Sequence, residues 1–412
     1  MLVYKDRIDK FYQYLIVFLG LSIPLTVVGA KIAAFLLVLV WLLTGDYKNK
    51  IIQLNTNPVA KYSLIFFSVH IFGLLWTEDI LWGMEVVKKM IDFGVLLPIL
   101  PLLFHKENLK YYIGAFLISI IFSQIASYLI LFDVIEPFRH ATFGNPTPFM
   151  SSISHGPFMA FAFYLFLKIA STYGSNMSHR FVLFFMSALT AVTIFTNNGR
   201  TGQVAYFILV LVIIWQNFGL RLKTFATFFF VTTFTLVLAV NFSPTFKDRA
   251  VKIVDEYQLY IENPNISGYG SSIGLRIAMA KNSLEIVKDN ILFGVGTGDF
   301  KNLYKSINEI NTPGLPSTEN PHNMYILLLT QLGLFGLLPL LALFLKMILT
   351  SKKMSPGLVK DIGFALTIMF FVINFSDSYL LGHFTTFLFI FFSACIFCNS
   401  IYEKNPNNNS KI

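Results

Sequence analysis

The stretch Asn320–Leu338, NPHNMYILLLTQLGLFGLL, decides the class of fold to which this chain belongs. It contains no Asp, Glu, Lys or Arg, and the apolar run continues to Leu345. A helix needs about 20 mostly apolar residues to cross a bilayer. The stretch therefore predicts a membrane-spanning helix that opens on a proline and a histidine.

The whole chain has the same apolar character. Of its 412 residues, 55% are hydrophobic and 13% are charged, whereas soluble domains carry about 25% charged residues. Apolar segments predict twelve spans, at residues 11–28, 30–44, 60–76, 88–104, 111–132, 154–172, 181–197, 203–217, 224–243, 322–345, 359–376 and 381–400. The sequence therefore predicts an all-α polytopic membrane protein with about twelve transmembrane helices.

The predicted spans divide the chain into four parts. Residues 1–243 hold spans one to nine, 244–321 form one large loop, 322–400 hold the last three spans, and 401–412 form a polar tail. The loop contains two amphipathic stretches, at residues 246–262 and 275–289, so it is expected to be partly helical.

Lysine and arginine residues concentrate in the loops on the side of the two chain ends. Because such residues accumulate on the cytoplasmic side, we expect cytoplasmic termini and place the large loop on the outer face. This distribution explains most of the net charge of +9. The charge therefore indicates no nucleic-acid partner, and the expected surroundings are membrane lipids.

Pro-His-Asn at the start of the tenth span raises the question of what the histidine does. Asn320 suits an N-cap and Pro321 the first helical position, so His322 is expected in the first helical turn, at the outer boundary. The helix dipole there disfavours imidazolium, and a neutral imidazole can accept a proton. The same helix end attracts anions such as phosphate. The alternative is an interfacial histidine that only forms hydrogen bonds among lipid headgroups.

Two arginines are candidates for binding phosphate. Arg200, in NNGRTGQ after the seventh span, lies close to the hydrocarbon, where a charge is unfavourable unless it is used or reaches the interface. Arg276 lies near the start of the second amphipathic helix, where an incoming anion would relieve the unfavourable dipole. The guanidinium fork matches phosphate oxygens. The alternatives are an interfacial anchor for Arg200 and a solvated side chain for Arg276.

Weaker candidates lie on the same outer face. Lys88 and Lys89 are expected at the outer start of the fourth span, and Asp377 at the outer end of the eleventh. Each of them fits an anchor or a salt-bridge partner as well as a ligand. His155 is also expected at the outer edge, and neither His155 nor Lys89 is given a role.

Metal and nucleotide motifs are weak in this sequence. Glu78 and Asp79 are adjacent carboxylates without an evident third ligand, so we expect no catalytic metal and no cofactor. The segment GVGTGDF, residues 294–300, lacks the preceding strand of a dinucleotide-binding unit and is interpreted as a tight turn.

The stronger candidates share one face of the membrane. One base, His322, and two phosphate ligands, Arg200 and Arg276, suit transfer from a phosphate-activated donor on a lipid carrier. A polysaccharide or lipid transporter is the alternative of another class. A transporter should place ionisable residues along a path through the middle of the membrane, so the surface position favours an enzyme.

With these features together, the sequence resembles the O-antigen ligase family of bacterial envelope enzymes over most of its length. The resemblance rests on the order of the spans and of three motifs: NNGRTGQ, then GLRIAMAKNSLEIVKDNILFGVGTGDF in the large loop, then PHNMYILLLTQLGLFGLL leaving it. Gln331 departs from the pattern, since related sequences often carry an acidic residue there. This departure concerns the subgroup and the acceptor more than the chemistry.

The resemblance implies a GT-C-like glycosyltransferase of the bacterial inner membrane with a periplasmic site. It would transfer a glycan from undecaprenyl pyrophosphate to a sugar hydroxyl of lipid A–core. By position, His322 corresponds to the proposed base and Arg200 and Arg276 to the pyrophosphate ligands, with Lys88 and Asp377 as weaker correspondences. An O-antigen polymerase and a protein O-oligosaccharyltransferase are the alternatives within this chemistry.

Overall fold

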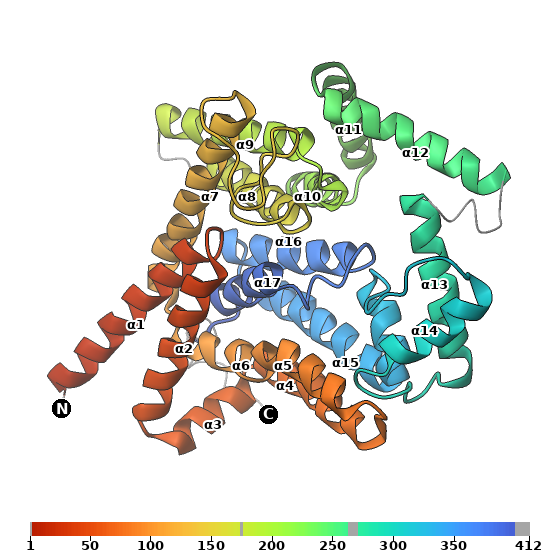
Figure 1. Ribbon diagram of the computed structural model, residues 1–412. Coiled ribbons are helices and arrows are strands. Elements are labelled where there is room, and N and C mark those ends of the chain that lie inside the picture. Colours follow the sequence, from red (N-terminus) through yellow and green to blue (C-terminus); the bar gives the residue numbers. More distant parts are fainter. Residues whose placement is uncertain (1, 174–175, 263–270, 400–412) are drawn as a thin grey trace.

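A computed structural model of the chain describes residues 2–173, 176–262 and 271–399, and this described part is helical with no strand (Figure 1). By length and composition, seven of its helices could cross a membrane, as a polytopic membrane protein requires. They span Pro58–Trp76, Lys106–Leu131, Ser152–Thr172, Met177–Thr196, Arg200–Phe218, Leu222–Phe242 and Met324–Lys353. Two shorter apolar helices are Val27–Leu43 and His383–Ile396.

Each of the twelve predicted segments overlaps helix in the structure. The corresponding helices are α1 (Leu2–Ser22), α2 (Val27–Leu43), α4 (Pro58–Phe72), α5 (Ile80–Gly94) with α6 (Leu96–Leu103), α7 (Leu109–Leu131), α8 (Ser152–Tyr173), α9 (Met177–Thr196), α10 (Arg200–Phe218), α11 (Leu222–Phe242), α15 (Met324–Lys353), α16 (Leu358–Ile373) and α17 (His383–Ile396). A further helix, α3 (Tyr47–Thr56), and two short 3₁₀ turns, η1 (Gly73–Trp76) and η2 (Lys106–Asn108), lie in the connections. The predicted tail at 401–412 lies outside the described residues.

The fourth predicted segment, 88–104, is not one helix. Helix α5 begins eight residues earlier than expected, at Ile80, because the Asp79 side chain accepts a hydrogen bond from the Trp82 amide at 3.0 Å. The helix ends at Gly94, and α6 follows after Val95. Lys88 and Lys89 therefore lie within α5 rather than at the start of a helix.

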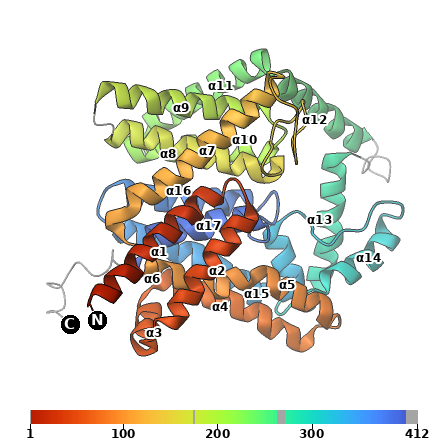
Figure 2. The same cartoon turned by 60° about the vertical axis from the view of Figure 1, so that its left-hand side comes forward.

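Helix α17 forms the centre of the bundle, and its residues Thr385–Ile396 are all buried. In both views it is enclosed by other helices (Figures 1 and 2). Its aromatic rings contact those of neighbouring helices, mostly edge to face, the geometry that aromatic quadrupoles favour, whereas the contact of Phe389 with Phe93 is tilted at 38°. The contacts are Phe389 with Phe93, Phe344 and Phe370, and Phe392 with Phe116 and Phe161.

Three helices gather at the end of the molecule away from α1, and they come from the segment predicted as the large loop (Figures 1 and 2). Helices α12 (Pro244–Glu262) and α13 (Ser272–Asp289) lie at the positions of the two predicted amphipathic stretches. Helix α14 (Phe300–Asn311) was not expected. It buries Phe300, Tyr304 and Asn308, a spacing of four residues that places all three on one helical face.

The predicted turn at 294–300 is confirmed, and it is inserted against a break in α15. Gly294, Gly296 and Gly298 all have positive φ, which glycine adopts without strain. Within α15, Gly333 leaves helical geometry, with φ 58° and ψ −152°. Four backbone hydrogen bonds join the two segments, from Val295 to Thr330, Gly296 to Gln331, Leu334 to Ile291 and Phe335 to Leu292. The turn thus supplies partners for backbone groups that the broken helix cannot pair internally.

Candidate functional site

The position of His322 differs from the expected one. Helix α15 begins at Met324, and the Asn323 side chain caps it by accepting hydrogen bonds from the Tyr325 and Ile326 amides at 3.0 and 3.1 Å. The predictions that Asn320 caps this helix and that His322 lies in its first turn are therefore wrong. His322 precedes the cap, in the left-handed region with φ 53°. Such backbone strain in a residue other than glycine is typical of functional sites.

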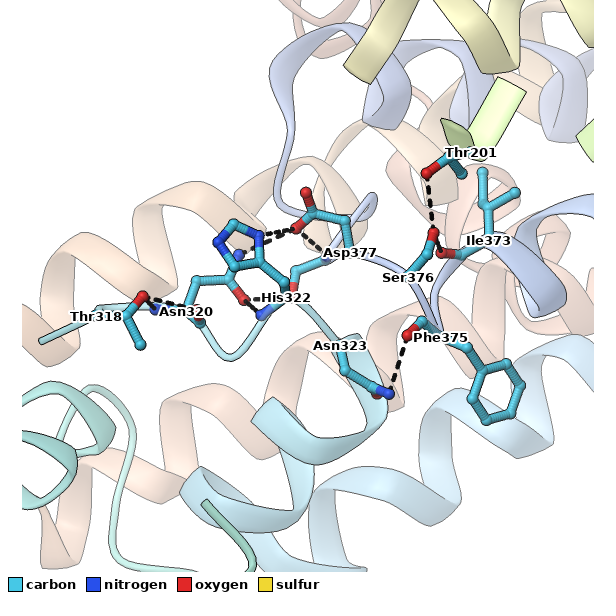
Figure 3. Close-up of polar contacts among 10 residues, drawn as sticks. Thr201, Thr318, Asn320, His322, Asn323, Ile373, Phe375, Ser376 and Asp377 are labelled. Atoms are coloured by element: carbon cyan, nitrogen blue, oxygen red, sulfur yellow. Dashed lines mark hydrogen bonds and ion pairs between the residues drawn. The ribbon is translucent and has the colours of Figure 1, made fainter. Parts of the chain in front are cut away.

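His322 is paired with Asp377, from the loop between α16 and α17. The His322 Nδ1 atom lies 3.2 Å from Asp377 Oδ1 (Figure 3). Burial raises the pKa of Asp377, but the hydrogen bond and charge of His322, the Ser378 amide and the charge of Arg276 together hold this pKa below its ordinary value. Asp377 is therefore an ionised acceptor, so Nδ1 of His322 carries the hydrogen. The Nε2 atom of the neutral ring is left as the acceptor.

Asn320 fixes the orientation of this pair. Its Oδ1 accepts hydrogen bonds from the His322 amide at 3.0 Å and from the Ser378 hydroxyl at 2.9 Å. Its Nδ2 donates to Asp377 Oδ1 at 3.4 Å (Figure 3). One amide thus joins the loop before α15 to the loop before α17, and it holds His322 in its left-handed conformation.

Arg200 and Arg276 line the same cavity, which we call the arginine cavity. It has a volume of about 380 Å³. Its lining consists of Ile153, Asn198, Gly199, Arg200, Thr201, Arg249, Lys252, Glu256, Ser272, Arg276, Asp377 and Tyr379. Four cationic side chains face two carboxylates there, so the lining carries a net positive charge. The structure brings three of the predicted site residues, including Asp377, to this one cavity.

Arg249 and Lys252 of α12 were missed from the sequence. The apolar periodicity of this segment indicates only its apolar face, whereas these two residues lie on its polar face, one turn apart. Arg249 donates a hydrogen bond to the Asn198 carbonyl, and burial together with the charge of Arg200 lowers its pKa. Like charges held this close repel each other, so an anion in the cavity would be attracted.

Two close contacts position the start of α10, where Arg200 is the first residue. Gly202 packs on Gly156 of α8 so tightly that a Cβ atom on Gly202 would lie 2.5 Å from the Gly156 Cα. The Thr201 hydroxyl lies 3.1 Å from the Ser376 hydroxyl, which joins α10 to the loop that carries Asp377 (Figure 3). Helix α10 therefore presents Arg200 beside that loop.

A second cavity, of about 280 Å³, is also lined by Asp377. We call it the tryptophan cavity, and it is lined by Trp82, Val86, Lys89, Ile153, Ser154, Glu319, Asn320, Leu327, Gln331, Asp377, Ser378, Tyr379, Leu381, Gly382 and Thr385. The two cavities share Ile153, Asp377 and Tyr379 as lining residues. Their common wall is thus adjacent to His322.

Lys88 and His155 are not brought to either cavity. The Lys88 side chain is 74% exposed, and its Nζ lies 3.5 Å from Glu85 Oε1. Its neighbour Lys89 lines the tryptophan cavity instead. His155 is fully buried, and its Nδ1 lies 3.1 Å from Asn197 Nδ2. Gly156 of α8 and Gly202 of α10 let these two helices pack closely next to His155.

Carboxylates do not gather into a metal-binding group in the described part of the chain. Among those residues, no three His, Cys, Asp or Glu side chains lie together as metal ligands would. The adjacent pair Glu78 and Asp79 has a different environment, because both backbone amides donate to the Asp299 carboxylate, at 2.8 and 2.9 Å. This contact fixes the loop before α5.

Residues 185–341 match the family model described as O-antigen ligase. This part of the chain, less than half of its length, is therefore similar to that family. The matched region runs from α9 into α15 and includes Arg200, Arg276 and His322, whereas Asp377 lies beyond it. No curated protein matches the chain. The match supports, in general terms, an enzyme of the O-antigen ligase or polymerase type.

Proposed function

We propose that this protein belongs to the O-antigen ligase family and transfers a glycan from undecaprenyl pyrophosphate to a sugar hydroxyl of lipid A–core. The observation that carries the proposal is the position of the His322–Asp377 pair beside the arginine cavity. A proton acceptor and a concentration of positive charge at one place are what transfer from a pyrophosphate-activated donor requires.

The reaction would proceed by attack of the acceptor hydroxyl on the first carbon of the donor sugar. His322 Nε2 takes the hydroxyl proton, and Asp377 stabilises the imidazolium that forms. The new carbon–oxygen bond forms as the bond to pyrophosphate breaks, and the leaving pyrophosphate keeps the electron pair. Arg200, Arg249 and Arg276 stabilise the charge that develops on its oxygens. No metal ion takes part.

We infer a GT-C-like arrangement of twelve spans in the bacterial inner membrane, with both termini in the cytoplasm. The seven long apolar helices support it, together with the shorter apolar helices α2 and α17. In this topology α12, α13 and α14 lie in the periplasm and the site faces that compartment. Undecaprenyl pyrophosphate and lipid A–core would reach it from the outer leaflet.

An O-antigen polymerase is the second candidate, because it would use the same base and the same cations. The ligase and the polymerase differ in the acceptor that they use. In proteoliposomes that contain only carrier-linked glycan, a ligase releases little undecaprenyl pyrophosphate and makes no longer chains. Added lipid A–core then gives one larger product per acceptor. Chains that lengthen without lipid A–core would establish the polymerase instead.

Protein O-glycosylation and transport make different predictions. A protein O-oligosaccharyltransferase would glycosylate a protein acceptor in the same assay. A transporter would move labelled glycan across the bilayer without releasing pyrophosphate. His322→Ala is the direct test of the enzyme, since general-base catalysis contributes about 10²–10⁴-fold to rate. Near-normal transfer by a folded His322→Ala protein would refute the proposed function.

A further inference from the structure

The tryptophan cavity is chemically unlike the arginine cavity, although the two share a wall. It has one cation, Lys89, two carboxylates, Glu319 and Asp377, and several amides and hydroxyls beside the apolar side chains Val86, Leu327 and Leu381. Such a mixed lining suits a polyhydroxylated ring, which has many hydroxyl groups at its edge and C–H groups on its faces.

Its tryptophan is held in place by charged neighbours. Lys301 Nζ lies 4.2 Å from the centroid of the Trp82 ring and forms an ion pair with Glu319 at 2.6 Å. Lys89 Nζ lies 5.0 Å from the same ring. These contacts join α5, α14 and the segment before α15, so the wall of the cavity is organised before a ligand arrives.

Gln331 is the buried polar group at the inner side of this cavity, with an exposed fraction of 5%. Its Oε1 accepts a hydrogen bond from the Gly298 amide at 3.2 Å, so the side chain is oriented by the turn that fills the break in α15. The amino group of the same amide is the donor that this residue can offer to a hydroxyl or carbonyl oxygen in the cavity.

We propose that the tryptophan cavity binds the acceptor sugar and that Gln331 determines which sugar it accepts. This inference rests on the proposed function, because it needs a second substrate. With pyrophosphate in the arginine cavity and the acceptor in the tryptophan cavity, leaving group and nucleophile occupy two separate cavities that meet at Asp377. The acceptor hydroxyl then lies next to His322, on the shared wall.

Initial rates measured against both substrates test the assignment, with purified lipid A–core and undecaprenyl-pyrophosphate-linked glycan as the probes. Gln331→Glu keeps an oxygen for the Gly298 amide and replaces the amino group with a second oxygen. We expect it to raise the KM for lipid A–core about three- to tenfold and to leave the KM for the donor unchanged. Trp82→Ala should raise the acceptor KM further, whereas Leu81→Ala, on the exposed face of the same helix, should not.

Two results would overturn the subsite. One is an unchanged acceptor KM in both Gln331→Glu and Trp82→Ala. The other is a raised donor KM with a normal acceptor KM, which would mean that the cavity holds the donor sugar. A wild-type enzyme that lengthens carrier-linked chains without using lipid A–core would refute the ligase function itself. That result is visible without any variant, so the two failures are distinguishable.

Discussion

His322 and Asp377 are 55 residues apart in the sequence, and yet Nδ1 of the first lies 3.2 Å from Oδ1 of the second. Helices α15 and α16 lie between them in the chain and bring the two loops back to one end of the bundle. The carboxylate fixes which ring nitrogen carries the hydrogen. In this arrangement Asp377 is a positioning residue, and His322 is the group that meets the substrate.

Replacing Asp377 by asparagine should lower transfer about 10²–10⁴-fold. An asparagine NH₂ group donates to Nδ1, which forces the hydrogen onto Nε2 and removes the proton acceptor. The measurement is kcat for glycan transfer with both substrates saturating, and we expect little change in either KM. Full activity in a folded Asp377→Asn protein would mean that His322 does not depend on this carboxylate.

The same variant should show a pH-dependent difference in stability. The pKa of Asp377 is lowered in the folded state from the model-compound value of 3.8, so its contribution to stability is complete well above that pH and is lost as the pH falls through the folded-state pKa. Thermal unfolding of wild type and Asp377→Asn in detergent should therefore differ most near neutral pH. The two curves should converge in strong acid, and a gap that widens on acidification would contradict the assigned direction.

Arginine-to-lysine substitutions test the arginine cavity. Arg200→Lys and Arg276→Lys keep the charge but lose the planar fork, and each should reduce kcat/KM for the donor by about 10–100-fold, because hydrogen bonds to charged groups contribute about 1.5–3 kcal/mol. Arg249→Ala, identified only from the structure, should also weaken donor use. If all three variants transfer glycan at the wild-type rate, the cavity does not bind pyrophosphate.

The contact between α8 and α10 can be tested through stability. Gly202→Ala puts a methyl group against the Gly156 backbone and should destabilise the protein by about 1–3 kcal/mol. Gly114→Ala is the matched control in α7, because a Cβ atom there meets nothing within 4 Å. Thermal unfolding should show a lowered Tm for the first variant alone. Equal Tm values would mean that the helices separate readily at this point.

Metal removal should leave the activity intact. We expect purified protein to transfer glycan at its normal rate in excess chelator, because the proposed cations are side chains. A requirement for Mg²⁺ or Mn²⁺ that is restored by adding the ion back would contradict this and direct attention to Glu78 and Asp79.

Apolar length predicted where the helices lie, because each long apolar segment must satisfy its backbone internally. It did not predict the interruption at Val95 or the start of α5, since these depend on the cap at Asp79 and on packing. The start of α15 was misplaced for a local reason. Asn320 and Asn323 are both good N-cap residues, and Pro321 favours the earlier one, but the Asn323 side chain is the one that reaches the first-turn amides.

The candidate site was partly accessible from the sequence. Arg200 and Arg276 were predicted as site residues because a positive charge is unfavourable at both positions. In the structure both line one cavity. Lys88 and Lys89 are adjacent, so the sequence does not show which of them faces the site. The orientation of α5 about its axis places Lys89 at the tryptophan cavity. Arg249 and Lys252 look like ordinary surface charges on an amphipathic helix. Only the packing of α12 near α10 and α13 shows that they line the cavity.

The break in α15 at Gly333 affects how the chain can be assembled during synthesis. The Leu334 and Phe335 amides are paired with the Ile291 and Leu292 carbonyls rather than with the helix that precedes them. In the proposed topology, residues 291–298 precede α15 in the chain and therefore cross the membrane before α15 enters it. The Ile291 and Leu292 carbonyls are therefore already in the periplasm when α15 enters the bilayer. Helix α15 then completes its backbone hydrogen bonds by packing against this segment. Insertion of this helix is thus coupled to translocation of the segment before it.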